Sequence, residues 1–138
     1  MTNEMTFNTN SLFEKVTFDK NADHWLFSFA DKIYVSSSGF WRLLENNKIV
    51  FVSFDNEQQF GLPEPINLAG ELNKMLIGKC LTKIEVIKDT FDLTLTLTDE
   101  LKFEIYISSS GYETYDFSIN DKRYIGLGSG DIAVMDYN

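Results

Sequence analysis

The strongest constraint on the fold of this chain is a two-residue alternation of apolar and polar side chains in its second half. Residues 93–98 read Leu-Thr-Leu-Thr-Leu-Thr. Because successive side chains of a β-strand point to opposite faces, this pattern is typical of a half-buried strand, as found in antiparallel sheets. We expect strands over residues 81–87, 91–97, 101–107, 112–119, 123–127 and 132–135.

The first half of the chain also has the pattern of strands. His24 to Ala30 carries three aromatic residues at every second position, and further strands are expected over 33–44 and 49–54. Polar pairs separate the strands, namely Asp31-Lys32, Asn46-Asn47 and, later, Asp99-Glu100 and Asn120-Asp121. Asn tolerates the positive φ that two-residue hairpin turns require. Residues 11–16 are expected to form a short helix of little more than one turn.

One segment has the spacing of a longer helix. Its apolar residues Leu68, Leu72, Met75 and Leu76 fall on one stripe. Asn67 is placed to cap the start of the helix, and Gly78 follows its end. The order of strands, helix and strands favours an α+β fold over a parallel βαβ sheet. We predict a predominantly antiparallel β structure in which two related β-meander halves surround a central helix.

A repeated segment relates the two halves. Ile33–Phe40 reads IYVSSSGF and Ile105–Tyr112 reads IYISSSGY. A repeat of this kind indicates a domain built from two similar units. The predicted organisation is one domain, 1–138, with a first half over about 11–57 and a second half over about 75–138.

Two interpretations fit the repeated serines. Small hydroxyls beside a glycine can bind an anion through backbone N–H groups. Alternatively, Gly39 and Gly111 supply bends between strands, and the serines satisfy the backbone groups that the bends leave free. The repetition favours the bend, because a scaffold feature repeats with its scaffold. The glycines of Gly126–Asp131 lack the Lys-Ser/Thr of a phosphate loop and predict a tight hairpin.

Composition narrows the partners that the chain can bind. Its 138 residues include 21 acidic and 12 basic side chains, for a net charge of -9. This charge repels nucleic acids and anionic membranes and suits a basic partner, although it also suits plain solubility. The chain has no apolar run of about 18 residues, its first ten residues lack the pattern of a secretory signal, and Cys80 is the single cysteine. We expect a cytoplasmic protein that does not bind nucleic acid or membrane.

No set of residues predicts catalysis. His24 is the single histidine and has no nucleophile placed with it. One histidine and one cysteine cannot build a zinc site without carboxylates. The carboxylate pairs Asp89 with Asp92 and Glu113 with Asp116 match the residue types of a glycosidase, but any acidic chain contains such pairs. We therefore predict no enzymatic activity, no cofactor and no metal site.

The segment after the second serine run predicts an interaction surface. Tyr112, Glu113, Tyr115 and Asp116 interleave two tyrosines with two carboxylates. Tyrosines supply rigid contact area and carboxylates pair with Arg or Lys of a basic partner. The alternative is a solvated strand face whose tyrosines cover the edge of the core. In the first half the corresponding stretch, Phe40–Leu44, is apolar, so only the second half is expected to bind a partner.

The chain resembles the small acidic immunity proteins of bacterial polymorphic and contact-dependent toxin systems. The resemblance is one of type over the whole chain: size, acidity, an α+β body and no catalytic set. The stretches Ser109–Glu113 and Gly128–Asp131 are similar to features of small bacterial families. The resemblance implies an inhibitor that binds a cognate basic toxin domain in a stoichiometric complex. The alternative is a small-molecule-binding or other non-enzymatic cytosolic domain.

Overall fold

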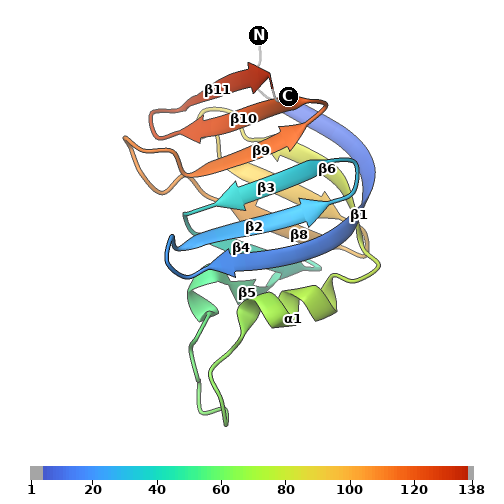
Figure 1. Ribbon diagram of the computed structural model, residues 1–138, viewed down its shortest axis with the longest axis vertical. Coiled ribbons are helices and arrows are strands. Elements are labelled where there is room, and N and C mark those ends of the chain that lie inside the picture. Colours follow the sequence, from blue (N-terminus) through green and yellow to red (C-terminus); the bar gives the residue numbers. More distant parts are fainter. Residues whose placement is uncertain (1–4, 137–138) are drawn as a thin grey trace.

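The computed structural model describes residues 5–136, which form one antiparallel sheet of 11 strands folded into two layers (Figure 1). The strands are β1 (Met5–Asp19), β2 (His24–Phe29), β3 (Ile33–Ser37), β4 (Trp41–Glu45), β5 (Lys48–Val52), β6 (Cys80–Val86), β7 (Leu93–Leu97), β8 (Leu101–Ile105), β9 (Tyr115–Ile119), β10 (Lys122–Leu127) and β11 (Asp131–Asp136). The helices are η1 (Ser53–Asp55) and α1 (Leu68–Met75). Across the sheet the strands follow the order β11-β10-β9-β3-β2-β1-β6-β7-β8-β4-β5.

The long strand β1 belongs to both layers. Its first part, up to Leu12, pairs with β6, and its second part, from Phe13, pairs with β2. The register shifts on both sides of this point, as at a β-bulge, where strands bend. The short helix expected over 11–16 is therefore wrong, since these residues form the bend of β1. One helical turn gains few hydrogen bonds for the residues that it fixes, whereas β1 finds pairing strands on both sides.

The expected α+β fold with two meanders around a central helix is also wrong. The structure is mostly antiparallel sheet, and α1, with eight residues, is the one α-helix within residues 5–136. It lies beside β1, where the side chain of Asn73 accepts from the N–H of Val16 and donates to its carbonyl oxygen. Leu68 and Leu72 are buried as predicted, but a helix of two turns cannot cover two sheets. The two layers cover each other instead.

Aromatic side chains fill the space between the layers. Phe27 of β2 packs against Trp41 of β4 and Phe103 of β8, with ring centroids 5.5 and 4.9 Å apart. All three side chains are completely buried. The indole N–H of Trp41 has no hydrogen-bond partner, alone among the buried side-chain nitrogens and oxygens of the described residues. Its ring meets that of Phe27 at 82°, the edge-to-face arrangement that aromatic pairs favour.

Apart from β11, the sheet has the same strand order in its two halves. From the centre outward, one half reads β1-β2-β3-β9-β10 and the other reads β6-β7-β8-β4-β5, so each strand of β1–β5 corresponds to the strand numbered five higher. When the halves are matched by their tight turns, 31–32 with 99–100, Ile33 of β3 corresponds to Leu101 of β8. The repeated octapeptide instead matches Ile33 with Ile105. Residues 33–37 of its first copy form β3 and residues 38–40 leave the strand, whereas its second copy begins at the last residue of β8 and continues as a loop. The same letters therefore have two structures, and the duplication of the chain stays a prediction.

The strands are connected in two different ways at their two ends. At the tight-turn end, residues 30–32, 46–47, 98–100 and 120–121 make the predicted hairpins, each with two residues at φ between 53° and 65°. At the crossing end lie residues 20–23, 38–40, 53–57, 87–92, 106–114 and 128–130. Two of these segments carry the chain between layers: the first crossing, 38–40, and the second crossing, 106–114. The first crossing divides the strand expected over 33–44 into β3 and β4.

Candidate functional site

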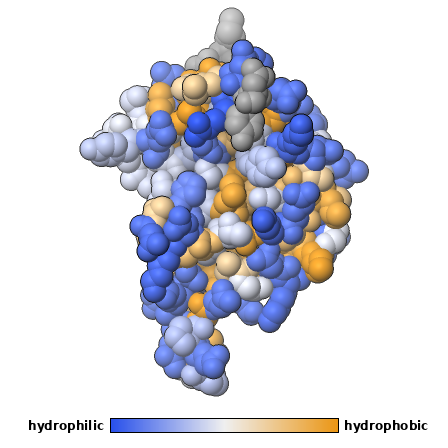
Figure 2. Space-filling view, in the orientation of Figure 1, coloured by the Kyte–Doolittle hydropathy of each residue, from blue (hydrophilic) through white to orange (hydrophobic). Residues whose placement is uncertain are grey.

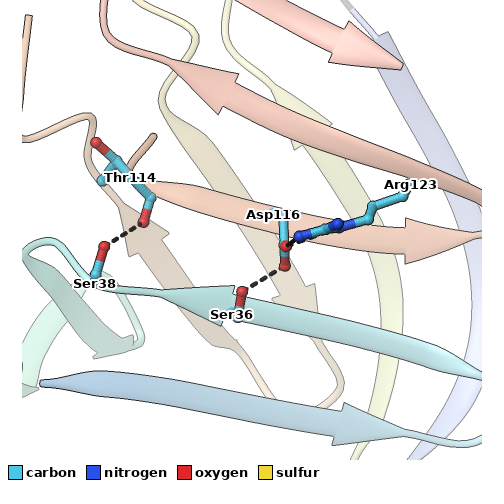
Figure 3. Close-up of polar contacts among 5 residues, drawn as sticks. All are labelled: Ser36, Ser38, Thr114, Asp116 and Arg123. Atoms are coloured by element: carbon cyan, nitrogen blue, oxygen red, sulfur yellow. Dashed lines mark hydrogen bonds and ion pairs between the residues drawn. The ribbon is translucent and has the colours of Figure 1, made fainter. Parts of the chain in front are cut away.

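The two crossings lie side by side, so both copies of the repeat meet at the crossing end. The N–H of Ser38 donates to the carbonyl oxygen of Thr114 at 2.9 Å, and the N–H of Tyr106 donates to that of Phe40 at 2.9 Å. The hydroxyl of Ser38 also donates to the Thr114 carbonyl oxygen at 3.3 Å (Figure 3). Ser108 Oγ accepts from the N–H of Phe40 at 3.1 Å. The crossings therefore form a hydrogen-bonded ribbon between the layers.

The two glycines of the repeat differ in what surrounds them. A Cβ atom on Gly39 would lie 2.5 Å from Thr114 Cγ2 and 2.6 Å from Ser108 Oγ, whereas a Cβ atom on Gly111 would meet nothing within 4 Å. The first crossing thus needs glycine because the second crossing passes so close to it. Five of the six serine hydroxyls of the repeat bond to the protein itself, as the bend interpretation expected; Ser110 is the sixth. Ser109 Oγ, for example, accepts from the N–H groups of Gly111 and Tyr112.

The second crossing is held from both sides. Asp92 Oδ1 accepts from the N–H of Ile107 at 2.8 Å. On the other side, the hairpin between β10 and β11 packs on its backbone, because a Cβ atom on Gly128 would lie 2.1 Å from the carbonyl oxygen of Ser109. The expected hairpin over Gly126–Asp131 is confirmed, with Leu127 paired to Asp131. These contacts fix the loop that carries Tyr112.

The structure places the four predicted partner-binding residues in three different environments. Tyr112 is 81% exposed and Glu113 is also exposed, both on the second crossing. Tyr115 is 2% exposed, and its hydroxyl donates to the carbonyl oxygen of Phe91 at 2.8 Å. Burial raises the pKa of this hydroxyl. Tyr115 shares a face of β9 with the buried Phe117 and Ile119, so alternation turns its side chain into the core and it is not available as a surface anchor.

Asp116 lies on the outer face of the sheet in a polar network (Figure 3). It accepts from the hydroxyl of Ser36 on β3 and from the guanidinium of Arg123 on β10, whose Nε is 2.9 Å away. His24 and Tyr34 line the same shallow depression of about 420 Å³. The charge of Asp116 is therefore paired within the protein. Figure 2 shows that the surface seen from this side is mostly hydrophilic, with hydrophobic residues in interrupted patches.

A second arginine–carboxylate pair lies on β4 and β8 beside the crossings. Arg42 Nε donates to Glu104 at 2.6 Å, the Tyr106 hydroxyl donates to the same carboxylate at 3.1 Å, and the guanidinium carbon lies 5.6 Å from the Tyr106 ring centroid. Burial alone would raise the pKa of Glu104, but the hydrogen bonds from Arg42 and Tyr106 hold it below its ordinary value. The hydrogen bond to Glu104 raises the pKa of Arg42. This pair stiffens the strands next to the site.

The crossing end contains a pocket of about 370 Å³, here called the crossing pocket. Four aromatic side chains and two carboxylates from separate segments line it, together with serine hydroxyls: Phe18, Trp25, Phe40, Phe54, Asp23, Glu57, Ser38, Ser53 and Ser108, with Gly39 and Asn56 completing the lining. Sequence reasoning missed this site except for the repeated serines. Its residues come from four connections and from strands β1 and β2, and no local spacing relates them.

The aromatic side chains of the crossing pocket contact each other in two tilted pairs. Phe18 and Trp25 have ring centroids 4.5 Å apart, and Phe40 and Phe54 have centroids 5.2 Å apart. Trp25 is 3% exposed, whereas Phe54 is 72% exposed. The pocket therefore has a buried aromatic floor and an open aromatic rim.

The described part of the chain has neither a metal-type cluster nor a membrane-spanning helix. Within residues 5–136, no three His, Cys, Asp or Glu side chains are grouped as a metal site would need. No helix of the described part is long and apolar enough to cross a membrane. Comparison with models of protein families, with curated proteins and with solved structures finds no match to this chain.

Proposed function

We propose that this protein is an immunity-type inhibitor, which binds a basic bacterial toxin domain in the cytoplasm in a stoichiometric complex. The observation that carries the proposal is the exposed Tyr112 on the second crossing, a loop fixed by hydrogen bonds at an end of the sheet where carboxylates outnumber lysines. A large aromatic side chain held in place at an acidic surface suits recognition of a basic protein. The proposal includes no catalytic step.

Acidic side chains outnumber basic ones at the crossing end. Its six carboxylates belong to Asp23, Asp55, Glu57, Asp89, Asp92 and Glu113, and its two lysines are Lys20 and Lys88. Asp55 and Asp92 accept hydrogen bonds from the backbone and so hold their connections in place. The remaining excess of negative charge attracts a basic partner and speeds encounter.

The rigidity of the second crossing favours binding through Tyr112. Ordering a loop on binding costs free energy, which a loop already fixed does not lose again. Tyrosine adds wide contact area with few rotatable bonds. Since Tyr115 is in the core and the charge of Asp116 is paired with Arg123, Tyr112 and Glu113 remain as the proposed contacts among the four predicted residues.

Co-expression with a cognate toxin tests the function. The probe is the toxin-domain protein encoded beside the gene for this chain, with cell survival and complex mass by light scattering as readouts. We expect one-to-one complexes and survival, and at least about a tenfold loss of affinity in the double variant Tyr112→Ala/Glu113→Ala. Tyr34→Ala, which removes a partly exposed tyrosine from β3, is the matched control.

Two outcomes would contradict separate parts of the proposal, the inhibitor function and the assignment of the interface. If the wild-type protein forms no complex and gives no protection, the inhibitor function is wrong. If the double variant protects as well as wild type, the function stands but Tyr112 and Glu113 are not the interface. The alternative, a small-molecule-binding module, is favoured by the crossing pocket, and the next experiment separates it from protein recognition.

A further inference from the structure

We infer that the crossing pocket binds a basic side chain, with the guanidinium of arginine as the preferred group. This inference deepens the proposed function, because it names a contact that a basic partner would make. It can be tested without any partner, so its failure and that of the proposed function are distinguishable. Three properties of the pocket carry it: its aromatic walls, its unpaired carboxylate and the hydrogen-bonding character of its hydroxyls.

The walls suit a flat cation on an aliphatic stem. A guanidinium is attracted to the faces of aromatic rings, within about 6 Å of the ring centroid. The crossing pocket is lined by two aromatic pairs, Phe40 with Phe54 and Phe18 with Trp25. Its volume of about 370 Å³ admits a side chain rather than a folded peptide. Phe54, 72% exposed, is the ring that such a ligand would cover.

The carboxylates give the pocket its charge preference. Within residues 5–136 the side chain of Asp23 makes no hydrogen bond or ion pair with another residue. Glu57, from a different connection, pairs with Lys20 at 3.5 Å across a solvent-exposed gap. Exposed pairs of this kind contribute only about 0–1 kcal/mol. An incoming guanidinium would therefore displace Lys20 at little cost and meet two carboxylates.

The serine hydroxyls of the pocket act as acceptors toward a ligand. Ser38 gives its proton to the carbonyl oxygen of Thr114, and Ser108 gives its proton to that of Tyr106. Their remaining lone pairs, like the carboxylates, accept hydrogen bonds. Arginine and lysine are donors with no acceptor, whereas sugars and anions present acceptors of their own. Ser53 and Asn56 are the exceptions in the lining: the Ser53 hydroxyl accepts from the N–H of Trp41 and keeps its own proton to donate, and the amide N–H group of Asn56 is a donor. The lining as a whole selects for a cation.

The test is a titration of the whole protein followed by ¹⁵N–¹H NMR. Nα-acetyl-L-arginine amide is the probe, and the matching citrulline amide, equal in shape but uncharged, is its control at constant ionic strength. We expect the arginine probe to shift the amide signals of residues 38–40 and 53–57, with the citrulline probe at least about fivefold weaker.

Substitutions of the charged residues test whether the arginine probe binds in the crossing pocket and whether negative charge attracts it. Asp23→Asn and Glu57→Gln are each expected to weaken arginine binding by about threefold, and Lys20→Ala to strengthen it by about twofold. Glu64→Gln is the matched control, because Glu64 lies in the same β5–α1 segment but lines a different hollow. Its dissociation constant for the arginine probe should equal that of wild type.

Several results would overturn the inference. Equal binding of the citrulline amide would show that charge is not recognised, and preferred binding of a neutral sugar such as methyl glucoside would assign the pocket to small molecules. Absence of shifts with the arginine probe would show that the pocket does not bind a basic side chain. In each case the proposed function keeps its own test through Tyr112 and Glu113. A toxin that is not inhibited, while arginine binding is intact, would overturn only the proposed function.

Discussion

The two ends of the strands differ in how much of their structure the sheet itself dictates. At the tight-turn end, four hairpins reverse the chain with two residues at positive φ each, so the turns there are short. At the crossing end the chain must pass between layers, and its longer connections carry an exposed tyrosine, carboxylates and a pocket. Sites commonly lie on loops that a rigid scaffold positions. The candidate binding surface therefore lies where the chain leaves the regular sheet, at the end that contains the two crossings.

The largest expected effect comes from Gly128, which lets the β10–β11 hairpin pack on the second crossing. Gly128→Ala places a Cβ atom 2.1 Å from the Ser109 carbonyl oxygen, and backbone atoms cannot give way as a side chain does. We expect a loss of about 3 kcal/mol in the free energy of unfolding, measured by urea denaturation. Gly111→Ala is the control, expected within about 0.5 kcal/mol of wild type. Equal effects at the two glycines would break the comparison, because the crossing end would then not be fixed by this contact.

A smaller effect, of opposite sign, is expected at the tight-turn end. Glu100 has φ of 63°, a conformation that non-glycine residues adopt at a cost of about 1–2 kcal/mol. Glu100→Gly produces the Asp-Gly pair that such turns prefer and should raise the free energy of unfolding by about 1 kcal/mol. Binding of the arginine probe should not change. A change in that binding would show that the two ends are coupled.

The smallest effect concerns pH and the pair Arg42–Glu104 next to the crossings. Because the native pKa of Glu104 lies below its ordinary value of 4.5, the unfolded chain takes up the proton first as pH falls. The stabilisation is therefore complete above about pH 4.5 and is lost as pH falls through the lower native value. Glu104→Gln should remove this part of the acid dependence, by less than about 1 kcal/mol. An unchanged pH profile of urea midpoints would show that the pair does not stabilise the crossing end.

Local features of the fold could be predicted from the sequence, and features set by distant pairing could not. The turns at Asn46-Asn47 and Asp99-Glu100 and the cap at Asn67 depend on neighbouring residues, and the structure has all three. The bend of β1 depends on β2 and β6, which lie on either side of it only after folding. Without those partners, residues 11–16 had too little context to be assigned as a strand.

The candidate site divides in the same way. Tyr112 and Glu113 are exposed, as a contact surface predicted from composition and position in the repeat requires, and their role in binding stays a prediction. Tyr115 was misplaced although alternation alone puts its side chain on the same face as Phe117 and Ile119, which are apolar and buried. Asp23 and Glu57 meet at the crossing pocket only because their connections lie at the same end of folded strands. No spacing along the chain encodes that meeting.

The aromatic packing between the layers also provides an intrinsic spectroscopic probe of the folded state. Trp25 and Trp41 are the two tryptophans of the chain. They belong to opposite layers and lie edge to face, with ring centroids 5.1 Å apart. Indoles held in such fixed packing give a near-ultraviolet circular dichroism signal that disappears if the layers part, while loss of β-structure is seen at shorter wavelengths. Since Trp25 also forms the floor of the crossing pocket, the same chromophore pair reports whether the sandwich is closed and whether its pocket is occupied, without any added label.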